Sequence, residues 1–154
     1  MHGSCGCGEV QFELADKPLF VHCCHCRMCQ RQSGTAFALN ALIEADKVVR
    51  LQGAVETIEM PSSKPQGQRI TRCAACRTAL WSTYPGSGPR FFYVRVGALD
   101  NPDACGPDVH IFTESKQPWV RLPPETPVFE QFYDRESVWP AASLRRRQVV
   151  LDQP

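Results

Sequence analysis

Nine cysteines, eight of them gathered in three tight groups, constrain this 154-residue chain more than any other feature. The groups are Cys5 with Cys7, the run Cys23-Cys24-His25-Cys26-Arg27-Met28-Cys29, and Cys73 with Cys76. Disulfide frameworks usually show an even cysteine count in a short secreted chain, and such close neighbours suit a shared metal ion better than separate disulfides. No basic region leads into an apolar run at the start, so no secretory signal is visible. We therefore expect a cytoplasmic protein whose reduced cysteines bind metal.

The first and last groups together predict a closed zinc site. On extended backbone, residues two apart point to the same side, so the sulfurs of Cys5 and Cys7 can reach one ion. Cys73 and Cys76 form a C-x-x-C turn between two predicted strands, a spacing typical of structural zinc. Four thiolates would complete a tetrahedral site. The alternative is two unrelated thiol pairs, one of them redox-active, and the paired spacing favours zinc.

The middle group predicts a second site. Cys24, Cys26 and Cys29 form C-x-C-x-x-C, and His25, between two inward-facing cysteines, should point away from them. Cys23 offers an alternative C-x-x-C with Cys26, so the sequence leaves the third ligand open. Three thiolates leave one coordination position for water or substrate, as in catalytic zinc. A closed structural site with Cys23, His25 or a distant group as fourth ligand is the other interpretation.

Arginines flank these groups, with Arg27 and Arg31 in the middle run and Arg72 and Arg77 around the last pair. Thiolate-rich zinc carries surplus negative charge, and arginine stays charged and can donate to sulfur. We expect these side chains to compensate that charge.

The overall charge and hydropathy exclude two classes of protein. A formal net charge of +1 argues against the strongly basic face of a nucleic-acid-binding protein. No stretch approaches the roughly 18 apolar residues of a membrane span. A chain of this length also buries a core of its own, so metal would organise the fold without being its sole support.

The segment pattern predicts a mainly β protein, mostly antiparallel, with short helical segments. Strands are expected at residues 10–14, 35–43, 48–51, 55–59, 68–72, 79–82, 91–96 and 109–112, and loops at 61–65 and 84–89. One helix is expected at 27–33, because Gly34 follows it in the position that favours a helix stop. We place a zinc-binding domain at residues 3–129 and a C-terminal extension at 130–154, which includes Arg145-Arg146-Arg147 and is left without assigned structure.

A set of spaced residues carries a resemblance to a known family. They are Gly3-Ser4-Cys5-x-Cys7-Gly8-x-Val10-x-Phe12, Cys24-His25-Cys26-x-x-Cys29 with Ser33-Gly34 and Phe37, Arg72-Cys73-x-x-Cys76-x-Thr78-x-Leu80, Gly97 with Leu99-Asp100, and His110-Ile111-Phe112-x-x-Ser115-Lys116-x-x-Trp119. The chain resembles the glutathione-dependent formaldehyde-activating enzyme family, which also includes the centromere protein V-like domain.

The resemblance implies an Mss4-like β fold organised by two zinc ions per chain. It implies a structural zinc at Cys5, Cys7, Cys73 and Cys76. It implies a second zinc with an exchangeable fourth ligand at Cys24, Cys26 and Cys29. The His110 to Trp119 signature belongs to the broad branch of the family, whereas the founding branch has a longer and different C-terminal half.

The implied activity is that of a carbon–sulfur lyase. The open zinc would bind the thiolate of glutathione, and formaldehyde would add to the sulfur to give S-hydroxymethylglutathione. Arg27, Arg31 and Lys116 are candidates to hold the two carboxylates of the tripeptide. His110 is the candidate for proton transfer, the alternative being a packed histidine satisfied by backbone. The alternative function is a non-catalytic zinc module that binds a protein or another thiol ligand.

Five further residues outside these groups also lead to expectations. Tyr133 and Trp139 could cover the core of a partner subunit in a homodimer. Trp81 and Trp119 are expected in the core or lining a pocket. Cys105, which has no cysteine neighbour, is expected to be a spare thiol.

Overall fold

The fold is described from a computed structural model that covers residues 1–62 and 65–153, so residues 63–64 of the predicted loop 61–65 lie outside the described residues. The strands are β1 His2–Ser4, β2 Gln11–Leu14, β3 Phe20–Cys24, β4 Ala38–Glu44, β5 Val48–Gln52, β6 Val55–Met60, β7 Gln68–Cys73, β8 Ala79–Thr83, β9 Phe91–Arg95 and β10 Val109–Ile111. The α-helices are α1 Arg27–Ser33, α2 Arg135–Val138 and α3 Ala141–Leu151. Single 3₁₀ turns occupy Ala45–Lys47, Val96–Ala98, Pro102–Ala104 and Thr113–Ser115. A longer 3₁₀ segment, Pro85–Arg90, overlaps the predicted loop 84–89 and ends one residue beyond it. The prediction of a mainly β protein is confirmed.

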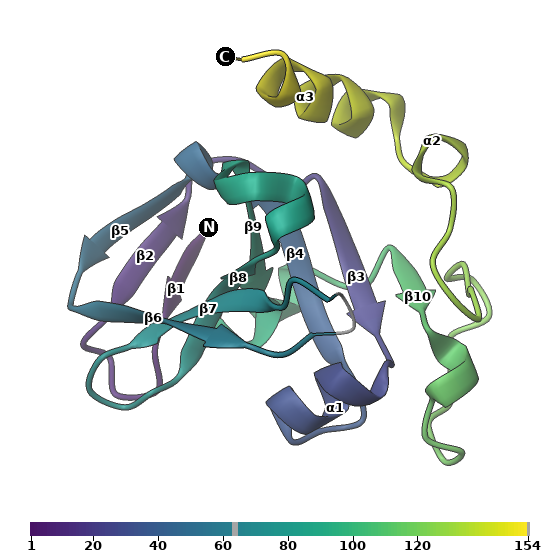
Figure 1. The fold of residues 1–154 in the computed structure, drawn as a ribbon, viewed down its shortest axis with the longest axis horizontal. Coiled ribbons are helices and arrows are strands. Elements are labelled where there is room, and N and C mark those ends of the chain that lie inside the picture. The colour runs from purple at the N-terminus through teal and green to yellow at the C-terminus, as the bar shows by residue number, and fades with distance from the viewer. Residues whose placement is uncertain (63–64, 154) are drawn as a thin grey trace.

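The strands form two sheets (Figure 1). The smaller sheet has the order β1-β2-β5, and the larger has the order β10-β3-β4-β9-β8-β7-β6. Neighbours pair antiparallel except β10, which runs parallel to β3 with His110 opposite Cys23. The larger sheet is therefore mixed, and the expectation of mostly antiparallel pairing is confirmed, with β10 as the exception.

The main apolar core lies between the two sheets, because each contributes one face of large side chains to it. Phe12 from the small sheet and Trp81 from the large one are both buried and pack edge to face, with ring centroids 5.6 Å apart. Leu80 and Val94, fully buried, belong to the same cluster. Gly3 is needed here, since an added Cβ would lie 2.4 Å from the Phe12 ring.

A second core lies under the C-terminal segment, which runs past β10 and ends in α3 above the sheet (Figure 1). Trp139 stacks on Phe20 with centroids 5.1 Å apart, and its Nε1 donates to the Tyr133 hydroxyl at 2.7 Å. Tyr133 also lies 2.7 Å from His22 Nε2. Tyr133 and Trp139 thus cover the core of their own chain, where the sequence suggested a partner subunit.

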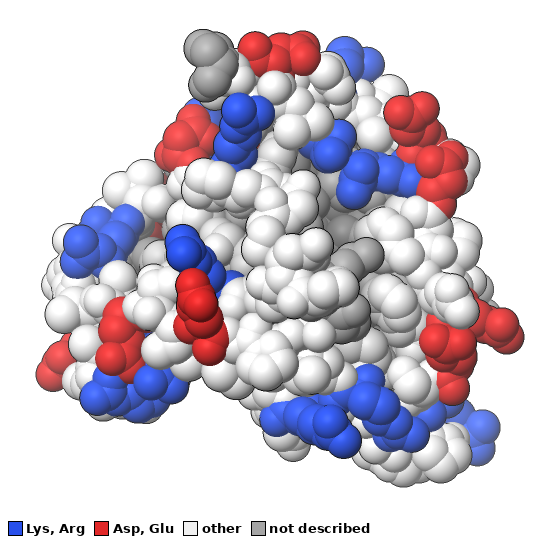
Figure 2. All heavy atoms as spheres, viewed as in Figure 1, with Lys and Arg blue, Asp and Glu red and all other residues white. Residues whose placement is uncertain are grey.

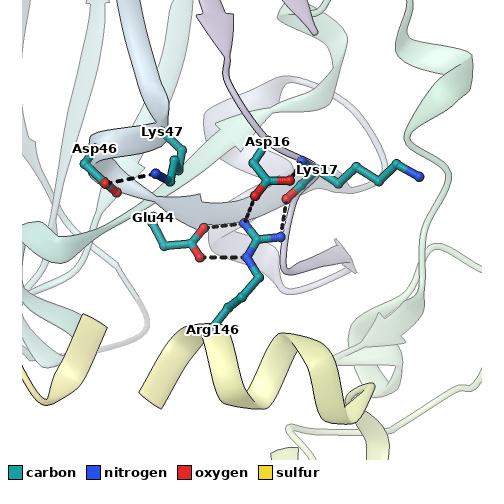
Figure 3. Close-up of polar contacts among 6 residues, drawn as sticks. All are labelled: Asp16, Lys17, Glu44, Asp46, Lys47 and Arg146. Atoms are coloured by element: carbon teal, nitrogen blue, oxygen red, sulfur yellow. Dashed lines mark hydrogen bonds and ion pairs between the residues drawn. The ribbon is translucent and has the colours of Figure 1, made fainter. Parts of the chain in front are cut away.

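One ion pair joins α3 to the sheet (Figure 3). Arg146 donates from Nε and Nη2 to the two carboxylate oxygens of Glu44, at 2.9 and 2.7 Å, and from Nη1 to the Lys17 carbonyl at 2.9 Å. Asp16 lies 3.6 Å away. Since Glu44 sits at the end of β4 with a side chain only 5% exposed, this contact ties the C-terminal helix to the domain.

The helix α1 matches the predicted residues 27–33, and both its ends have a local cause. Cys26 caps the first turn by accepting from the Cys29 amide at 3.4 Å. Gly34 ends the helix in the left-handed region, at φ 67°, and donates to the Gln30 carbonyl. This short turn fixes Cys29 relative to β3. In the described part of the chain, no helix combines the length and apolar character that crossing a bilayer requires.

Candidate metal centres

The first cysteine cluster brings together the four thiols expected to bind one ion. The sulfurs of Cys5, Cys7, Cys73 and Cys76 all lie within 4.8 Å of one another. Cys5 Sγ is 3.4 Å from Cys7 Sγ, which is 3.9 Å from Cys73 Sγ. A tetrahedral zinc ion with Zn–S bonds of about 2.3 Å holds its sulfurs about 3.8 Å apart. The donor set therefore fits zinc in both ligand type and spacing.

Local hydrogen bonds hold the two halves of this cluster together. The Val10 amide donates to Cys5 Sγ at 3.3 Å. Thr78 Oγ1 accepts from the Gly6 amide at 3.2 Å and lies 3.1 Å from Cys76 Sγ. Hydrogen bonding, first to Thr78, lowers the pKa of Cys76 to about 5, which favours the thiolate that metal requires.

Arg72 and Arg77 pair with a carboxylate near this cluster. Arg72 Nε donates to Glu56 Oε1 at 2.6 Å, and Arg77 forms an ion pair with the same oxygen. Hydrogen bonds from Arg77 and then Arg72 lower the pKa of Glu56. Both arginines are therefore paired with Glu56, and compensation of thiolate charge by them stays a prediction.

The second cluster consists of Cys24, Cys26 and Cys29, whose sulfurs lie within 4.8 Å of one another. Cys24 and Cys29 are buried and Cys26 is half-buried. The sequence left open whether Cys23 or Cys24 is the third ligand. In the structure Cys24 joins Cys26 and Cys29, whereas Cys23 lies with His25 and His110. Among the described residues, no fourth cysteine, histidine or carboxylate joins this group. Three thiolates with one position left free have the ligand count of an exchangeable zinc site.

The thiols of this cluster share protons. Hydrogen bonding with Cys26 raises the pKa of Cys24, and the same contact lowers the pKa of Cys26. Cys26 also accepts from backbone amides at the start of α1, which further favours its thiolate. Cys26 is therefore the thiol of this cluster whose surroundings most favour the thiolate, the form that binds metal.

Two polar side chains near the cluster have no local sequence signal. Burial, and then the charge of Cys29, raises the pKa of the Tyr84 hydroxyl, so it stays protonated and can donate. Arg95, in β9, acts on Cys29 through its positive charge. It also donates to Asn40 Oδ1, and to Ser82 Oγ at 3.1 Å. The pairing of β4, β9 and β8 brings Arg95 beside Asn40 and Ser82.

Two open grooves of about 770 Å³ each border this region. Arg95, Ser33 and Phe37 are among the residues lining the first, and Tyr84 and Met60 are among those lining the second. None of the three cluster cysteines lines either groove. A small ligand would meet Arg95 in the first groove and Tyr84 in the second.

The predicted substrate-binding residues lie in different surroundings. Arg27 is exposed on α1 and donates to Gln30 Oε1 at 2.9 Å, and Arg31 is exposed on the same helix. Basic side chains gather over α1 along the lower edge of the face in Figure 2, while charges of both signs alternate elsewhere on it. Lys116 donates instead to the carbonyls of Gln117 and Val120, at 3.1 and 2.8 Å.

The predicted proton carrier, His110, lies beside two other donors. Its Nδ1 is 3.0 Å from His25 Nε2, which is 3.5 Å from Cys23 Sγ. All three side chains are buried. His25 points away from the second cluster, as expected, and its ring contact with His110 was not anticipated.

Two tryptophans and one cysteine outside the clusters differ in how deeply they are buried. Trp81 is buried as expected. Trp119 is 69% exposed, so the expectation that it lies in the core or a pocket is wrong. Cys105 is buried beside the first groove, and burial raises the pKa of its thiol.

The chain is similar to a family of known proteins and to a solved structure. A family model described as "Glutathione-dependent formaldehyde-activating enzyme" matches residues 1–115. Among solved structures, a crystal structure of a Rhodobacter sphaeroides protein is similar, at 23% identity and a TM-score of 0.52, covering 69% of this chain and 95% of that one. This likeness concerns the fold. No curated protein matches the chain.

Proposed function

The chain belongs to the glutathione-dependent formaldehyde-activating enzyme family, and on that premise we propose that it binds glutathione at the second cysteine cluster and interconverts glutathione and formaldehyde with S-hydroxymethylglutathione. One observation carries this proposal. The sulfurs of Cys24, Cys26 and Cys29 converge, and no fourth cysteine, histidine or carboxylate among the described residues joins them. A ligand from outside the chain would complete such a site.

Two zinc ions would be held in this scheme, within an Mss4-like fold. Cys5, Cys7, Cys73 and Cys76 would hold a structural ion, because four thiolates fill its coordination. Cys24, Cys26 and Cys29 would hold the second. When bound there, zinc would supply the positive charge that keeps a substrate thiol ionised near neutral pH.

The proposed reaction is an addition in which atoms balance without a further reactant. A carbon–sulfur bond forms between the glutathione sulfur and the carbon of formaldehyde, and the thiol proton ends on the former carbonyl oxygen. The reverse reaction breaks that bond and returns both substrates. The Tyr84 hydroxyl, whose pKa is raised by burial, would donate to the oxyanion that develops in this step.

The carboxylates of the tripeptide would be held by arginines. Arg95 lines the first groove, and Asn40 and Ser82 fix the orientation of its guanidinium. Arg27 and Arg31 present further positive charge on α1, over which basic side chains gather (Figure 2). Lys116 is the weakest of the predicted contacts, because its ammonium already serves two backbone carbonyls.

Calorimetry of zinc-loaded protein with glutathione, cysteine and mercaptoethanol tests the binding step. Glutathione should bind more tightly than mercaptoethanol. If Arg95→Ala removes one carboxylate contact, the ratio of the two dissociation constants should fall about tenfold. Cys26→Ser should abolish binding of all three thiols, while Arg145→Ala, on α3, should leave it unchanged. The rate of hydroxymethyl adduct formation, followed by NMR, tests the chemical step.

Absence of heat for every thiol, with both cysteine clusters loaded, would overturn the open-site proposal. It would favour a non-catalytic zinc module, an alternative supported by the fact that no cysteine of the second cluster lines either groove. Thiol binding without faster adduct formation would leave a thiol-binding protein of different chemistry. A cytoplasmic location and a homodimer stay predictions.

A further inference from the structure

A third group of metal-binding side chains lies on the other side of the segment that supplies the second cluster. Along extended backbone, alternate side chains point to opposite faces. Cys24 and Cys26 meet Cys29 on one side, whereas Cys23 and His25 lie in a separate group with His110. The parallel pairing of β10 with β3 places His110 opposite Cys23 and so brings the second imidazole to this face.

We propose that Cys23, His25 and His110 form a third metal site, which binds Zn(II) through one thiolate and two imidazoles. The three ligand atoms lie within 4.8 Å of one another. Cys23 Sγ is 3.5 Å from His25 Nε2, which is 3.0 Å from His110 Nδ1. This inference does not depend on the reaction proposed above.

The spacing is close to what zinc requires. With Zn–S near 2.3 Å and Zn–N near 2.0–2.1 Å, a tetrahedral ion holds sulfur and nitrogen about 3.6 Å apart and two nitrogens about 3.3 Å apart. The sulfur–nitrogen distance already agrees, and the imidazoles need to separate by a few tenths of an ångström. Imidazole nitrogen and thiolate sulfur are both ligands that zinc prefers.

A hydrogen bond between two imidazoles would also give the 3.0 Å distance between His25 and His110. It does not account for the thiol, because Cys23 Sγ approaches the same His25 nitrogen. A single proton on that nitrogen can be donated well to one acceptor only. An ion between the three atoms satisfies all of them at once.

The three side chains that converge are almost completely buried. Cys23, His25 and His110 are 2%, 0% and 5% exposed. Polar groups so deeply buried are costly unless they have a partner, and an ion would give one to each of the three converging atoms. The other two ring nitrogens, His25 Nδ1 and His110 Nε2, would not bind this ion and have no partner among the described residues. A buried thiol and two buried imidazoles with their ligand atoms turned toward one another are the arrangement that a metal site requires.

Charge balance with the neighbouring cluster is also favourable. A divalent ion with one thiolate and two neutral imidazoles carries a net charge of +1. The same ion with the three thiolates of Cys24, Cys26 and Cys29 carries −1. Because the two ligand sets alternate along one segment, opposite charges would lie close together in a poorly solvated region, where they attract strongly.

Metal analysis of protein prepared with zinc and then dialysed tests this site. Wild type should retain one zinc per chain more than Cys23→Ala, whereas Cys105→Ala, which removes a buried thiol outside the three groups, should retain the wild-type content. X-ray absorption at the zinc edge should show imidazole scattering in wild type and in Cys26→Ser but not in Cys23→Ala.

Equal zinc content in wild type and Cys23→Ala, with no imidazole scattering in wild type, would overturn the proposal. If Cys23→Ala does not fold, anomalous diffraction from wild-type crystals decides the question. A zinc peak between the three ligand atoms supports the site, and its absence with the first cluster occupied refutes it. Loss of thiol binding at the second cluster leaves these measurements unaffected, so failure of the two proposals can be told apart.

Discussion

Removal of Arg146 should destabilise the whole domain, although this residue lies in the last helix. Its guanidinium holds both carboxylate oxygens of Glu44, at 2.9 and 2.7 Å (Figure 3). Arg146→Ala would leave the Glu44 carboxylate buried without its partner. Breaking a buried pair from one side costs roughly 3–5 kcal/mol. Since the Arg146 side chain is 30% exposed, water can partly replace it, and we expect a loss of about 3 kcal/mol in the free energy of unfolding.

Denaturant unfolding of zinc-loaded protein, followed by tryptophan fluorescence, measures this loss. Arg145→Ala is the matched control, because Arg145 is an exposed residue of the same helix with no ion pair to the described residues. It should change the free energy of unfolding by less than about 0.5 kcal/mol. In the Arg146→Ala background, Glu44→Gln should restore part of the loss, since a neutral amide is cheaper to bury than a charge. The double-mutant cycle reports the coupling.

Two results would refute this reasoning. If Arg146→Ala were no more destabilising than Arg145→Ala, the ion pair would be no better than an exposed one. If Glu44→Gln gave no recovery, the cost would come from lost packing of the arginine stem and not from a stranded charge.

Three further outcomes are expected. Cys73→Ser should lower the melting temperature more than Cys26→Ser, because the four-thiolate cluster joins distant parts of the chain while the second cluster serves ligand binding; equal losses would make both sites structural. Gly3→Ala should cost about 2 kcal/mol, since its Cβ would meet the Phe12 ring at 2.4 Å, and chemical denaturation measures this. Burial lowers the pKa of His22 from 6.5 to about 4, so the folded form stays neutral where the unfolded form takes up a proton. Stability should therefore fall as pH falls from about 6.5 toward 4, with a shallower slope in His22→Gln when unfolding is measured across that range.

Elements with strong local signals were predicted closely. The helix α1 has the predicted bounds because Gly34 provides the stop. The strands β5 to β8 begin at the residues expected, since turns separate their alternating segments. By contrast, β3 was not predicted, because its last residues, Cys23 and Cys24, were interpreted as metal ligands. The helix α3 also escaped prediction, because no apolar face stands out in its sequence.

Features that depend on distant pairing could not be found from the sequence. The cysteine spacings indicated which thiols could meet within each group, since only one or two residues separate neighbouring cysteines. Arg95 and Tyr84 reach the second cluster only through the order of β4, β9 and β8 in the sheet. His110 meets His25 because β10 joins the edge parallel to β3, and no local pattern indicates that pairing.

Side chains alternate between two faces from Cys23 to Cys26, so the number of residues in this segment decides which face each ligand occupies. One added or lost residue there would exchange its two faces, turning an imidazole toward the cluster of sulfurs and a thiol away from it. A change of two residues would keep the faces but move Cys23 out of register with His110. The length of this stretch is therefore fixed both by the alternation of its side chains and by the pairing of β3 with β10. Chains built this way should not tolerate an inserted or deleted residue in this stretch, even one that leaves all four side chains present.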